Sequence, residues 1–586
     1  MTIETAASDP RNQAPIGSTI RLLHALAVFL SAFLLFQVEP LIAKMILPWF
    51  GGVAAVWTVC LLFFQLMLLL GYLYAHLLTS IFSPRTQGLI HCALLAASLL
   101  TLPILPKDSW KPTGPEHPAL HILCVLALAV GLPFFLLSAT TPLLQAWLTK
   151  ATKSEGVFRF YALSNAGSLL ALLSYPTLFE PKLSTLWQAR SWSVAYTATA
   201  ALCGAIALTQ RGDAGREAKI SEALRPTWKT RFLWVALTAC SSALLLAITN
   251  HVSQNIAAVP LLWIIPLSLY LLSFILCFER SGWYRRTFFL RLLGVAIGGA
   301  AYALSPSYGA LPFWLLTLLF CAALFICCMF CHGELARLKP DPSHLTSFYF
   351  LSSLGSVAGA VFVALLAPQM FSGFYELHVA LAVCVLLVIV IHRGDPTSPF
   401  RRGGSQLPWV VLNALAAAVI VTLFLAARAQ PANTRLMVRN FYGALRVSDE
   451  VAPNVVLLKE GSEPSANDSR FRRLMNGTIS HGLQFLAPAR RDQPTSYYGR
   501  KSGIGIALQA LASRASLRVG VIGLGAGTIA AYGRAGDDYE FYEINPLVVR
   551  VAQQEFTFLR DSKARVAFEL GDARLTLERQ PPQQFD

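Results

Sequence analysis

Apolar stretches long enough to cross a lipid bilayer recur about thirteen times along this chain of 586 residues. A helix needs about 18–25 predominantly apolar residues to span the hydrocarbon core of a membrane. The mean hydropathy is +0.54 and only 13% of the residues are charged, which is too apolar for a soluble multidomain protein. The sequence therefore predicts a polytopic α-helical bundle whose main partner is the lipid bilayer. The predicted spans lie near 21–40, 54–78, 88–106, 119–148, 159–179, 191–209, 231–250, 257–278, 287–304, 310–332, 346–368, 374–392 and 407–428.

The first twelve spans contain an internal repeat. Residues 160–168 match residues 348–356 at six of nine positions, and Ala54–Val56 recurs as Ala257–Val259. The members of each pair are six spans apart. Two sets of six spans in the same orientation are typical of many secondary transporters, whose pathway lies between the halves. The alternative is that small-residue helices resemble one another because of their packing needs alone.

Basic residues predict the orientation of the bundle, because cytoplasmic loops carry an excess of Lys and Arg. If the N-terminus is cytoplasmic, most of the loop Lys and Arg residues fall on the cytoplasmic side, and the segment 210–230 is the most basic. We therefore expect a multi-pass protein of the inner (cytoplasmic) membrane with its N-terminus inside. Thirteen spans would then place residues 430–586 outside, away from any cytosolic cofactor. Either one predicted segment does not cross, or the C-terminal domain is not a working cytosolic enzyme, and we favour the first interpretation.

These patterns divide the chain into seven parts. The parts are a polar N-terminal tail (1–20), membrane repeat 1 (21–209), a basic cytoplasmic loop (210–230), membrane repeat 2 (231–392), a linking span (407–428), a small antiparallel β unit (435–500) and a Rossmann-like domain for a sulfonium nucleoside (501–586), incomplete at its C-terminus. In the β unit, short alternating runs at 445–447, 454–458 and 473–484 predict strands, and Asn476–Gly477 predicts a hairpin turn.

Polar side chains in the apolar part indicate a membrane pathway. Glu39 ends the first span, and a carboxylate there is unfavourable unless it faces protein or water. Two interpretations stay open for Glu39: it lines a cation path, or it is an interfacial carboxylate paired with Lys44. Asn250 and His251 occupy the equivalent place in the second half.

The segment from Cys328 to His332 matches the haem-attachment pattern C-x-x-C-H. It lies at the predicted cytoplasmic end of a span, whereas covalent attachment of haem would need the other face, so we expect neither haem nor metal. Two interpretations stay open. Cys328 and Cys331 are buried thiols, with His332 and Glu334 near lipid headgroups, or these last two residues gate a pathway.

A glycine-rich turn follows a short apolar strand in the last part of the chain. Its glycines are Gly523, Gly525 and Gly527, and two carboxylates follow at the ends of the next apolar runs, Glu543 and Asp572. Glycines let the backbone approach a ligand closely, and a carboxylate at this distance can accept both ribose hydroxyls. The spacing predicts a βαβαβ half-site for a nucleotide-like cofactor.

These motifs together resemble the spermidine synthase family, which are aminopropyltransferases on the class I methyltransferase fold. The resemblance is carried by the β unit with its Asn-Gly turn, by Gln484, by the segment Pro494–Tyr498 and by the glycine turn with its carboxylates. The apolar segment 36–51 resembles bacterial proteins in which such a domain is fused to a transporter-like bundle.

The resemblance implies a cofactor site for decarboxylated S-adenosylmethionine or S-adenosylmethionine. It implies that the three glycines face the cofactor, that Glu543 holds the ribose and Asp572 the adenine, and that Gln484 with Tyr497 or Tyr498 lines the pocket. The implied reaction is aminopropyl transfer to a diamine such as putrescine in polyamine biosynthesis, without a nucleic-acid partner.

Two departures from the family pattern bear on activity. Ala526 stands where the family has an Asp, and the sequence stops at Asp586, before the place of the catalytic base. No catalytic base is assigned, and the chain as given is expected to be inactive. The alternatives are a transporter with a degenerate nucleoside-sensing domain, or an S-adenosylmethionine-dependent methyltransferase.

Overall fold

The computed structural model describes residues 18–152, 157–210, 226–255, 261–279, 282–305, 312–341, 344–401, 406–429, 433–451, 470–477 and 479–586. Three features of the sequence lie outside these residues. They are most of the basic loop, the second Ala-Ala-Val segment at 257–259, and the predicted strand at 454–458.

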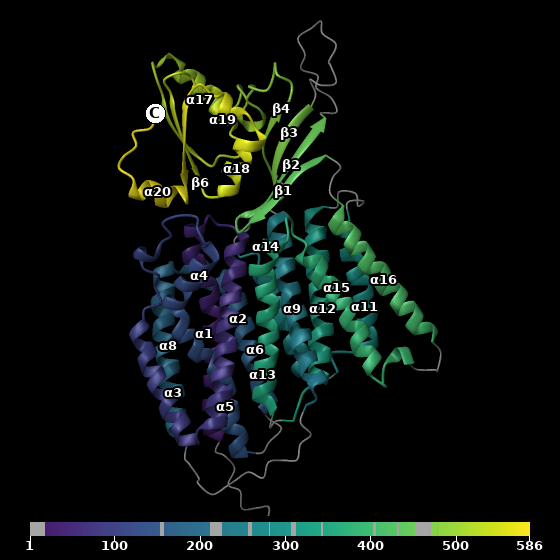
Figure 1. Cartoon of the computed structure of the whole chain (residues 1–586). Coiled ribbons are helices and arrows are strands. Elements are labelled where there is room, and N and C mark those ends of the chain that lie inside the picture. The colour runs from purple at the N-terminus through teal and green to yellow at the C-terminus, as the bar shows by residue number, and fades with distance from the viewer. Residues whose placement is uncertain are drawn as a thin grey trace, which may run out of the picture.

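Long helices make up the bundle, and its arrangement is followed in Figure 1. The helices are α1 (Ser18–Ile46), α2 (Ala54–Ile81), α3 (Pro84–Ser98), α4 (Pro118–Leu126), α5 (Leu132–Thr152), α6 (Val157–Ser174), α8 (Thr185–Leu208), α9 (Trp228–Asn255), α10 (Ile264–Glu279), α11 (Arg286–Ala303), α12 (Phe313–Arg337), α13 (Leu345–Val361), α15 (Glu376–Gly394) and α16 (Leu407–Arg428). Within the described part of the chain, nine helices are long and apolar enough to cross a membrane. The predicted polytopic helical bundle is confirmed.

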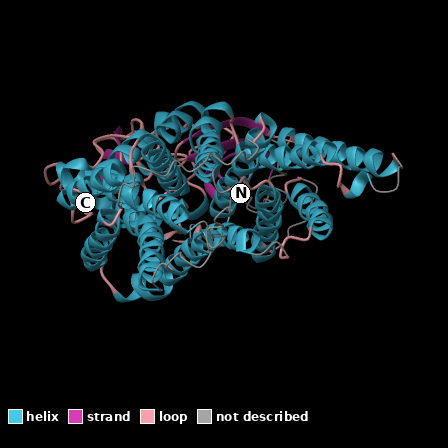
Figure 2. Cartoon of the chain, turned by 90° about the horizontal axis from the view of Figure 1, so that it is seen from below, coloured by secondary structure: helices cyan, strands magenta, loops and turns pink. Residues whose placement is uncertain are grey.

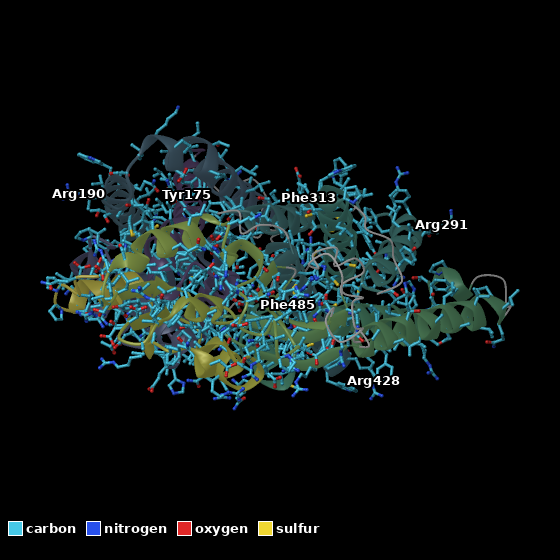
Figure 3. The ribbon with its side chains drawn as sticks, turned by 90° about the horizontal axis from the view of Figure 1, so that it is seen from above. Tyr175, Arg190, Arg291, Phe313, Arg428 and Phe485 are labelled. Carbon is cyan, nitrogen blue, oxygen red and sulfur yellow. The ribbon has the colours of Figure 1, made fainter. Side chains whose placement is uncertain are left out.

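The same helix pairings occur in both halves of the bundle. In the first half α1 packs against α6 and α8, and in the second half α9 packs against α13 and α15. The contacts between the halves also correspond, because α2 packs against α13 while α10 packs against α6. In Figure 3 the halves lie side by side, with Arg190 and Tyr175 of the first half on the left and Phe313 and Arg291 of the second half to their right. This pairing is what a duplicated six-span unit requires.

Short helical turns extend several membrane helices. α4 and α5 are joined by η5 (Ala127–Gly131); η6 (Tyr175–Phe179) and α7 (Glu180–Lys182) continue α6; η8 (Phe362–Leu366) and α14 (Ala367–Met370) continue α13. The last span, α16, lies at the edge of the bundle, and only 11% of its most apolar window is buried. Its exposed apolar face suits contact with lipid.

The C-terminal part sits at one end of the bundle, opposite to the end where α1 begins (Figure 1). Viewed from below, Figure 2 shows the helices in front of the strands. The short helices α3 and α11 lie alongside the longer helices of the bundle (Figure 1). That one of the thirteen predicted segments does not cross stays a prediction, because nine described helices are long and apolar enough to span a membrane and Ile264–Glu279 is a shorter apolar helix.

Two small sheets form the C-terminal part. The first is antiparallel, in the order β1 (Thr434–Asn440), β2 (Gly443–Val451), β3 (Arg470–Asn476) and β4 (Ile479–Phe485). The second is parallel, in the order β5 (Arg518–Ile522), β6 (Asp538–Glu543) and β7 (Arg565–Leu570). Four helices accompany them: α17 (Gly503–Ala510), α18 (Pro546–Glu555), α19 (Phe558–Asp561) and α20 (Ala573–Arg579).

The connection after the glycine turn differs from the expected βαβαβ unit. Between β5 and β6 the chain forms only the 3₁₀ turn η12 (Thr528–Tyr532), whereas α18 and α19 lie between β6 and β7. The sheets are small, and a complete class I methyltransferase fold is not present among the described residues.

Candidate transport cavity between the two halves

A cavity of about 170 Å³ lies between the two halves of the bundle. Its walls come from α1, α2, α5 and α6 of the first half and from α9, α10, α12 and α13 of the second. Because both halves contribute, a movement of one half against the other would change the shape and the access of this cavity.

The internal repeat places equivalent residues on opposite sides of the cavity. The lining residues that occupy equivalent positions in the repeat are Ser164, Asn165 and Ser168 of α6, and Ser352, Ser353 and Ser356 of α13. The hydrogen bonds within the helices also correspond. Ser168 donates to the Ser164 carbonyl at 3.0 Å, and Ser356 donates to the Ser352 carbonyl at 3.3 Å. The repeated segment therefore builds the site.

Two glycines at equivalent positions of the repeat, Gly167 and Gly355, explain how the two walls are held. A Cβ on Gly355 would lie 2.1 Å from Thr238 Oγ1 of α9, and a Cβ on Gly167 would lie 3.0 Å from the Phe29 carbonyl of α1. These glycines let α13 approach α9 and α6 approach α1, as small residues do at helix contacts in membranes.

Unpaired polar atoms face the cavity from both sides. Asn165 Nδ2 and Ser352 Oγ are buried and have no hydrogen-bond partner within the described residues. Buried polar atoms are nearly always paired, so unpaired ones at a cavity wall indicate a ligand or water there. Their occurrence on two equivalent helices points to one binding place between them.

Glu39 lines this cavity from α1, with a relative exposure of 3%. No described residue forms a hydrogen bond or an ion pair with its carboxylate. The alternative pairing with Lys44 is wrong, because Lys44 binds Glu180 at 2.6 Å. The predicted pathway residue thus lies in the cavity, and no basic group among the described residues pairs with its carboxyl group.

A hydrogen bond between the halves closes the cavity toward the C-terminal part. Thr58 Oγ1 of α2 donates to Asn250 Oδ1 of α9 at 2.6 Å, and the rings of Trp57 and Trp263 lie 5.1 Å apart. Thr58 and Asn250 also line a second cavity, together with Arg439 of β1. The predicted pathway residue Asn250 therefore separates two cavities. His251 packs against the Phe320 ring, with 4.5 Å between the ring centroids.

Toward the opposite end, two further contacts join the halves. His76 Nδ1 of α2 lies 2.8 Å from Thr346 Oγ1 of α13. Tyr349 of α13 donates to Gln145 Oε1 of α5 at 3.1 Å. The main cavity thus has polar contacts between the halves on both sides.

The segment from Cys328 to His332 lies in the core of the second half. Both nitrogens of the buried His332 ring are hydrogen-bonded, Nδ1 to Ser273 at 2.8 Å and Nε2 to Ser241 at 3.2 Å. Glu334 is 2% exposed and is bound by Arg286 at 2.8 Å. The expectation that Cys328 and Cys331 are buried thiols is confirmed, whereas the position of His332 and Glu334 relative to lipid headgroups stays a prediction. Among the described residues, their hydrogen-bond and ion-pair partners all belong to the second half, so these bonds do not bridge the halves.

In the C-terminal part, the predicted ribose ligand Glu543 holds the glycine turn. Its carboxylate accepts from the backbone N–H of Leu524 and of Asn545, each at 2.9 Å. Burial raises the pKa of Glu543, while these backbone donors oppose that rise. Gly525 has φ +57°, and a Cβ there would lie 2.5 Å from the His481 carbonyl of β4. Packing against β4 thus explains this glycine without a ligand.

The other predicted cofactor residues also have partners within the protein. Gln484 Nε2 donates to the Arg491 carbonyl at 2.8 Å, and Gln484 Oε1 accepts from the Thr557 N–H at 3.0 Å. Asp572 caps α20 by accepting from the Leu575 N–H at 3.1 Å. The rings of Tyr497 and Tyr498 lie against each other, with Tyr497 56% exposed.

The carboxyl edge of the parallel sheet faces the membrane bundle. Asp572 and Ile544 line a narrow cavity there with Trp49, Phe50 and the loop 112–115. A nucleoside at the predicted site would therefore contact the bundle. A Cβ on Gly523 would have no heavy atom of the described residues within 4 Å, so the space beside this glycine is open. Binding of S-adenosylmethionine or its decarboxylated form by these residues stays a prediction.

Two solved structures are similar to this chain. The nucleoside transporter NupG has 12% identity and a TM-score of 0.38, and the match covers 70% of this chain and 99% of NupG. The peptide transporter POT has 13% identity and a TM-score of 0.41, and the match covers 63% of this chain and 94% of POT. No protein-family model matches the chain, and no curated protein matches it.

These comparisons contradict the expected aminopropyl transfer to a diamine. Both similar structures are those of membrane transporters, and nothing in the comparisons supports a spermidine synthase domain, a transferase or polyamine biosynthesis. Because both TM-scores are low, the assignment of a function rests on the cavity itself.

Several residues that shape this site were not predicted from the sequence. Thr58, Gln145 and Thr346 are single polar residues in apolar helices, and their partners lie far away in the chain. Asn165 could have been found, because it lies within the repeated segment that the sequence already marked.

Proposed function

We propose that this protein is a membrane transporter for a small molecule, with its pathway between the two six-span halves. One observation carries the proposal: equivalent segments of the repeat, in α6 and α13, line the same cavity, which Glu39 also lines. A polar, partly unpaired cavity between two halves is what alternating access around a central site requires.

The transport cycle follows from the contacts that flank the cavity. Opening toward the C-terminal part breaks the bond between Thr58 and Asn250. Opening toward the other end breaks the contacts of Thr346 and Tyr349 with the first half. Each of these contacts is a single hydrogen bond, and such bonds between membrane helices contribute only about 0.6–2 kcal/mol. The halves can therefore exchange between arrangements.

We propose that the protein lies in the inner membrane with its N-terminus in the cytoplasm. The loops at the end where α1 begins hold most of the basic residues of the bundle, among them Arg85, Arg286, Arg337 and Arg393. Positive loops remain on the cytoplasmic side. The C-terminal part then lies outside the cytoplasm, where it covers the outer opening of the pathway.

The C-terminal part acts as a structural bridge over that opening. Arg439 of β1 binds Glu376 of α15 at 2.9 Å, so β1 is fixed to the second half. Arg579 of α20 donates to the Pro112 carbonyl of the first half at 2.9 Å. A domain attached to both halves must follow, and can limit, their relative movement.

The test is solute flux in proteoliposomes that contain the purified full chain. Vesicles are loaded with a defined mixture of nucleosides, short peptides, amino acids, organic amines and organic acids, and their contents are followed by mass spectrometry. We expect at least one class to leave faster than from protein-free vesicles. The double variant Ser164→Leu with Ser352→Leu fills the cavity and should abolish that flux.

Ser191→Leu is the matched control. Ser191 is exposed on α8, and its hydroxyl bonds only to its own helix, so this variant should keep the flux of the unmodified protein. Equal flux from the cavity-filled variant, or no flux for any solute class, would contradict the proposal.

A further inference from the structure

The charge of the central cavity is the property that selects a ligand. Glu39 is its one charged residue among the described lining residues, and the lining has no Lys, Arg or His within the described ranges. An anion would meet an uncompensated carboxylate and no positive group. A cation would instead supply the missing counter-charge, which a carboxylate in a low-dielectric site strongly favours.

Basic side chains near the cavity are engaged elsewhere. Lys44 binds Glu180. His332 is hydrogen-bonded through both ring nitrogens within the second half. Lys339 lies behind the wall, with its Nζ 4.6 Å from the centroid of the Phe278 ring. These groups therefore leave the Glu39 carboxylate as the dominant charge for a ligand in the cavity.

Aromatic rings form much of the remaining wall. Phe36 lies one helical turn from Glu39 on α1, and Tyr72, Tyr270 and Tyr349 contribute from α2, α10 and α13. The negative faces of aromatic rings attract organic cations, and rings around an acidic group are suited to quaternary or substituted ammonium ions. A hard metal cation would need about six oxygen ligands at close range, which a wall dominated by rings does not offer.

Neutral polar atoms complete the wall. Asn165 Nδ2 is an unpaired donor and Ser352 Oγ is an unpaired hydroxyl. Together they can bind a hydroxyl or carbonyl oxygen on the ligand, because Asn165 Nδ2 donates a hydrogen bond and the Ser352 hydroxyl can donate or accept one. The cavity thus combines one negative site with an apolar, aromatic middle and a neutral polar site.

From this combination we infer that the transported molecule is a small organic cation, an amine or quaternary ammonium compound, whose positive group pairs with Glu39. This inference rests on the proposed transport function. It adds the chemical class of the substrate and the residue that recognises its charge.

The test measures binding to the full chain in detergent by the shift of its thermal unfolding midpoint. The probes are choline, tetraethylammonium and benzyltrimethylammonium, with 3,3-dimethyl-1-butanol as the uncharged isostere of choline and 3,3-dimethylbutanoate as the anion. A ligand that binds only the folded state raises the midpoint with concentration. We expect at least one cation to raise it, and neither the isostere nor the anion to do so.

Variants show whether the carboxylate is responsible. Glu39→Gln keeps the shape and should weaken binding of the cation about tenfold or more, because a charge-assisted interaction is lost. Glu279→Gln is the control, since Glu279 is an exposed carboxylate at the end of α10, and it should bind like the unmodified chain. If Glu39→Gln does not fold, Phe36→Leu supplies the second test, with several-fold weaker binding of the cation expected.

Several results would overturn the inference. They are midpoint shifts by the isostere or the anion equal to those by the cations, no shift by any cation, or unchanged cation binding in Glu39→Gln. The failure of the transport proposal looks different. Cation binding that depends on Glu39 without any flux in proteoliposomes would reject transport and keep the binding site. Flux of only neutral or anionic solutes would keep the transport function and reject an organic cation as the substrate.

Discussion

Thr58 of α2 donates a hydrogen bond of 2.6 Å to Asn250 of α9. This bond joins the two halves of the bundle at a place between the main cavity and the second cavity. Leu61, one turn further along α2, already lines the main cavity. The pair therefore marks the point at which the pathway is closed toward the C-terminal part.

Replacing Thr58 with Val should favour opening at this point. The hydroxyl is lost while the size of the side chain is kept, and a hydrogen bond between membrane helices contributes about 1 kcal/mol, so the open state should become about fivefold more populated. Hydrogen–deuterium exchange of peptides from 54–62 and 245–255 should become faster. Thr422→Val is the control, because Thr422 bonds only within the exposed helix α16. If exchange of the same two peptides became equally faster in Thr422→Val, a gate at Thr58 would be refuted.

The ion pair between Arg439 and Glu376 should be essential for holding β1 on the bundle. Both side chains are almost fully buried, at 3% and 2% relative exposure. Removing one partner leaves a buried charge alone, which costs about 3–5 kcal/mol. We expect Arg439→Gln and Glu376→Gln each to lower the thermal unfolding midpoint strongly, and the double variant Arg439→Met with Glu376→Leu to recover much of the loss. Additive losses in the double variant would show that the two residues act independently.

Glu543→Gln should loosen the glycine turn. An amide keeps one acceptor oxygen but cannot accept from both the Leu524 and the Asn545 N–H. One buried donor is left unpaired, which costs about 1–3 kcal/mol. Exchange of the amides from 523 to 528 should become faster, whereas the control Glu540→Gln on the same strand should leave it unchanged. Unaltered exchange in Glu543→Gln would remove this residue from the support of the turn.

The antiparallel sheet should lose stability in acid through Asp449. Its pKa is lowered by the hydrogen bonds from Arg472, at 2.7 and 3.0 Å. A carboxyl with a lowered folded pKa stabilises the fold above its ordinary pKa and loses that effect as the pH falls through the folded value. Asp449→Asn should therefore destabilise the protein by about 1–2 kcal/mol at pH 7, and the difference should vanish as the pH falls well below 4. A difference that is independent of pH would assign the effect to packing.

The sequence predicted the parts of the membrane bundle that local patterns control. Apolar length marked the spans, and the repeated segment at 160–168 and 348–356 marked both walls of the cavity. The cost of a buried carboxylate was enough to single out Glu39, which lines the cavity. These inferences depend on residues close together in the chain.

Contacts between distant residues could not be predicted in this way. Lys44 has Glu180 as its partner rather than Glu39, and Thr58 binds Asn250, 192 positions away. In the C-terminal part the glycine spacing suggested a cofactor, yet Gly525 is required by the approach of β4, which no local pattern encodes.

Locking the contact between Thr58 and Asn250 tests the central claim, that the solute pathway runs between the two halves. The double variant Thr58→Cys with Asn250→Cys is reconstituted in proteoliposomes, with each single variant as a control for the native thiols. The solute that the unmodified chain releases should leave these vesicles in dithiothreitol, and its flux should stop after oxidation and return on reduction. Flux that is the same in the oxidised and reduced double variant, with the disulfide verified by mass spectrometry, would contradict a pathway that opens between α2 and α9.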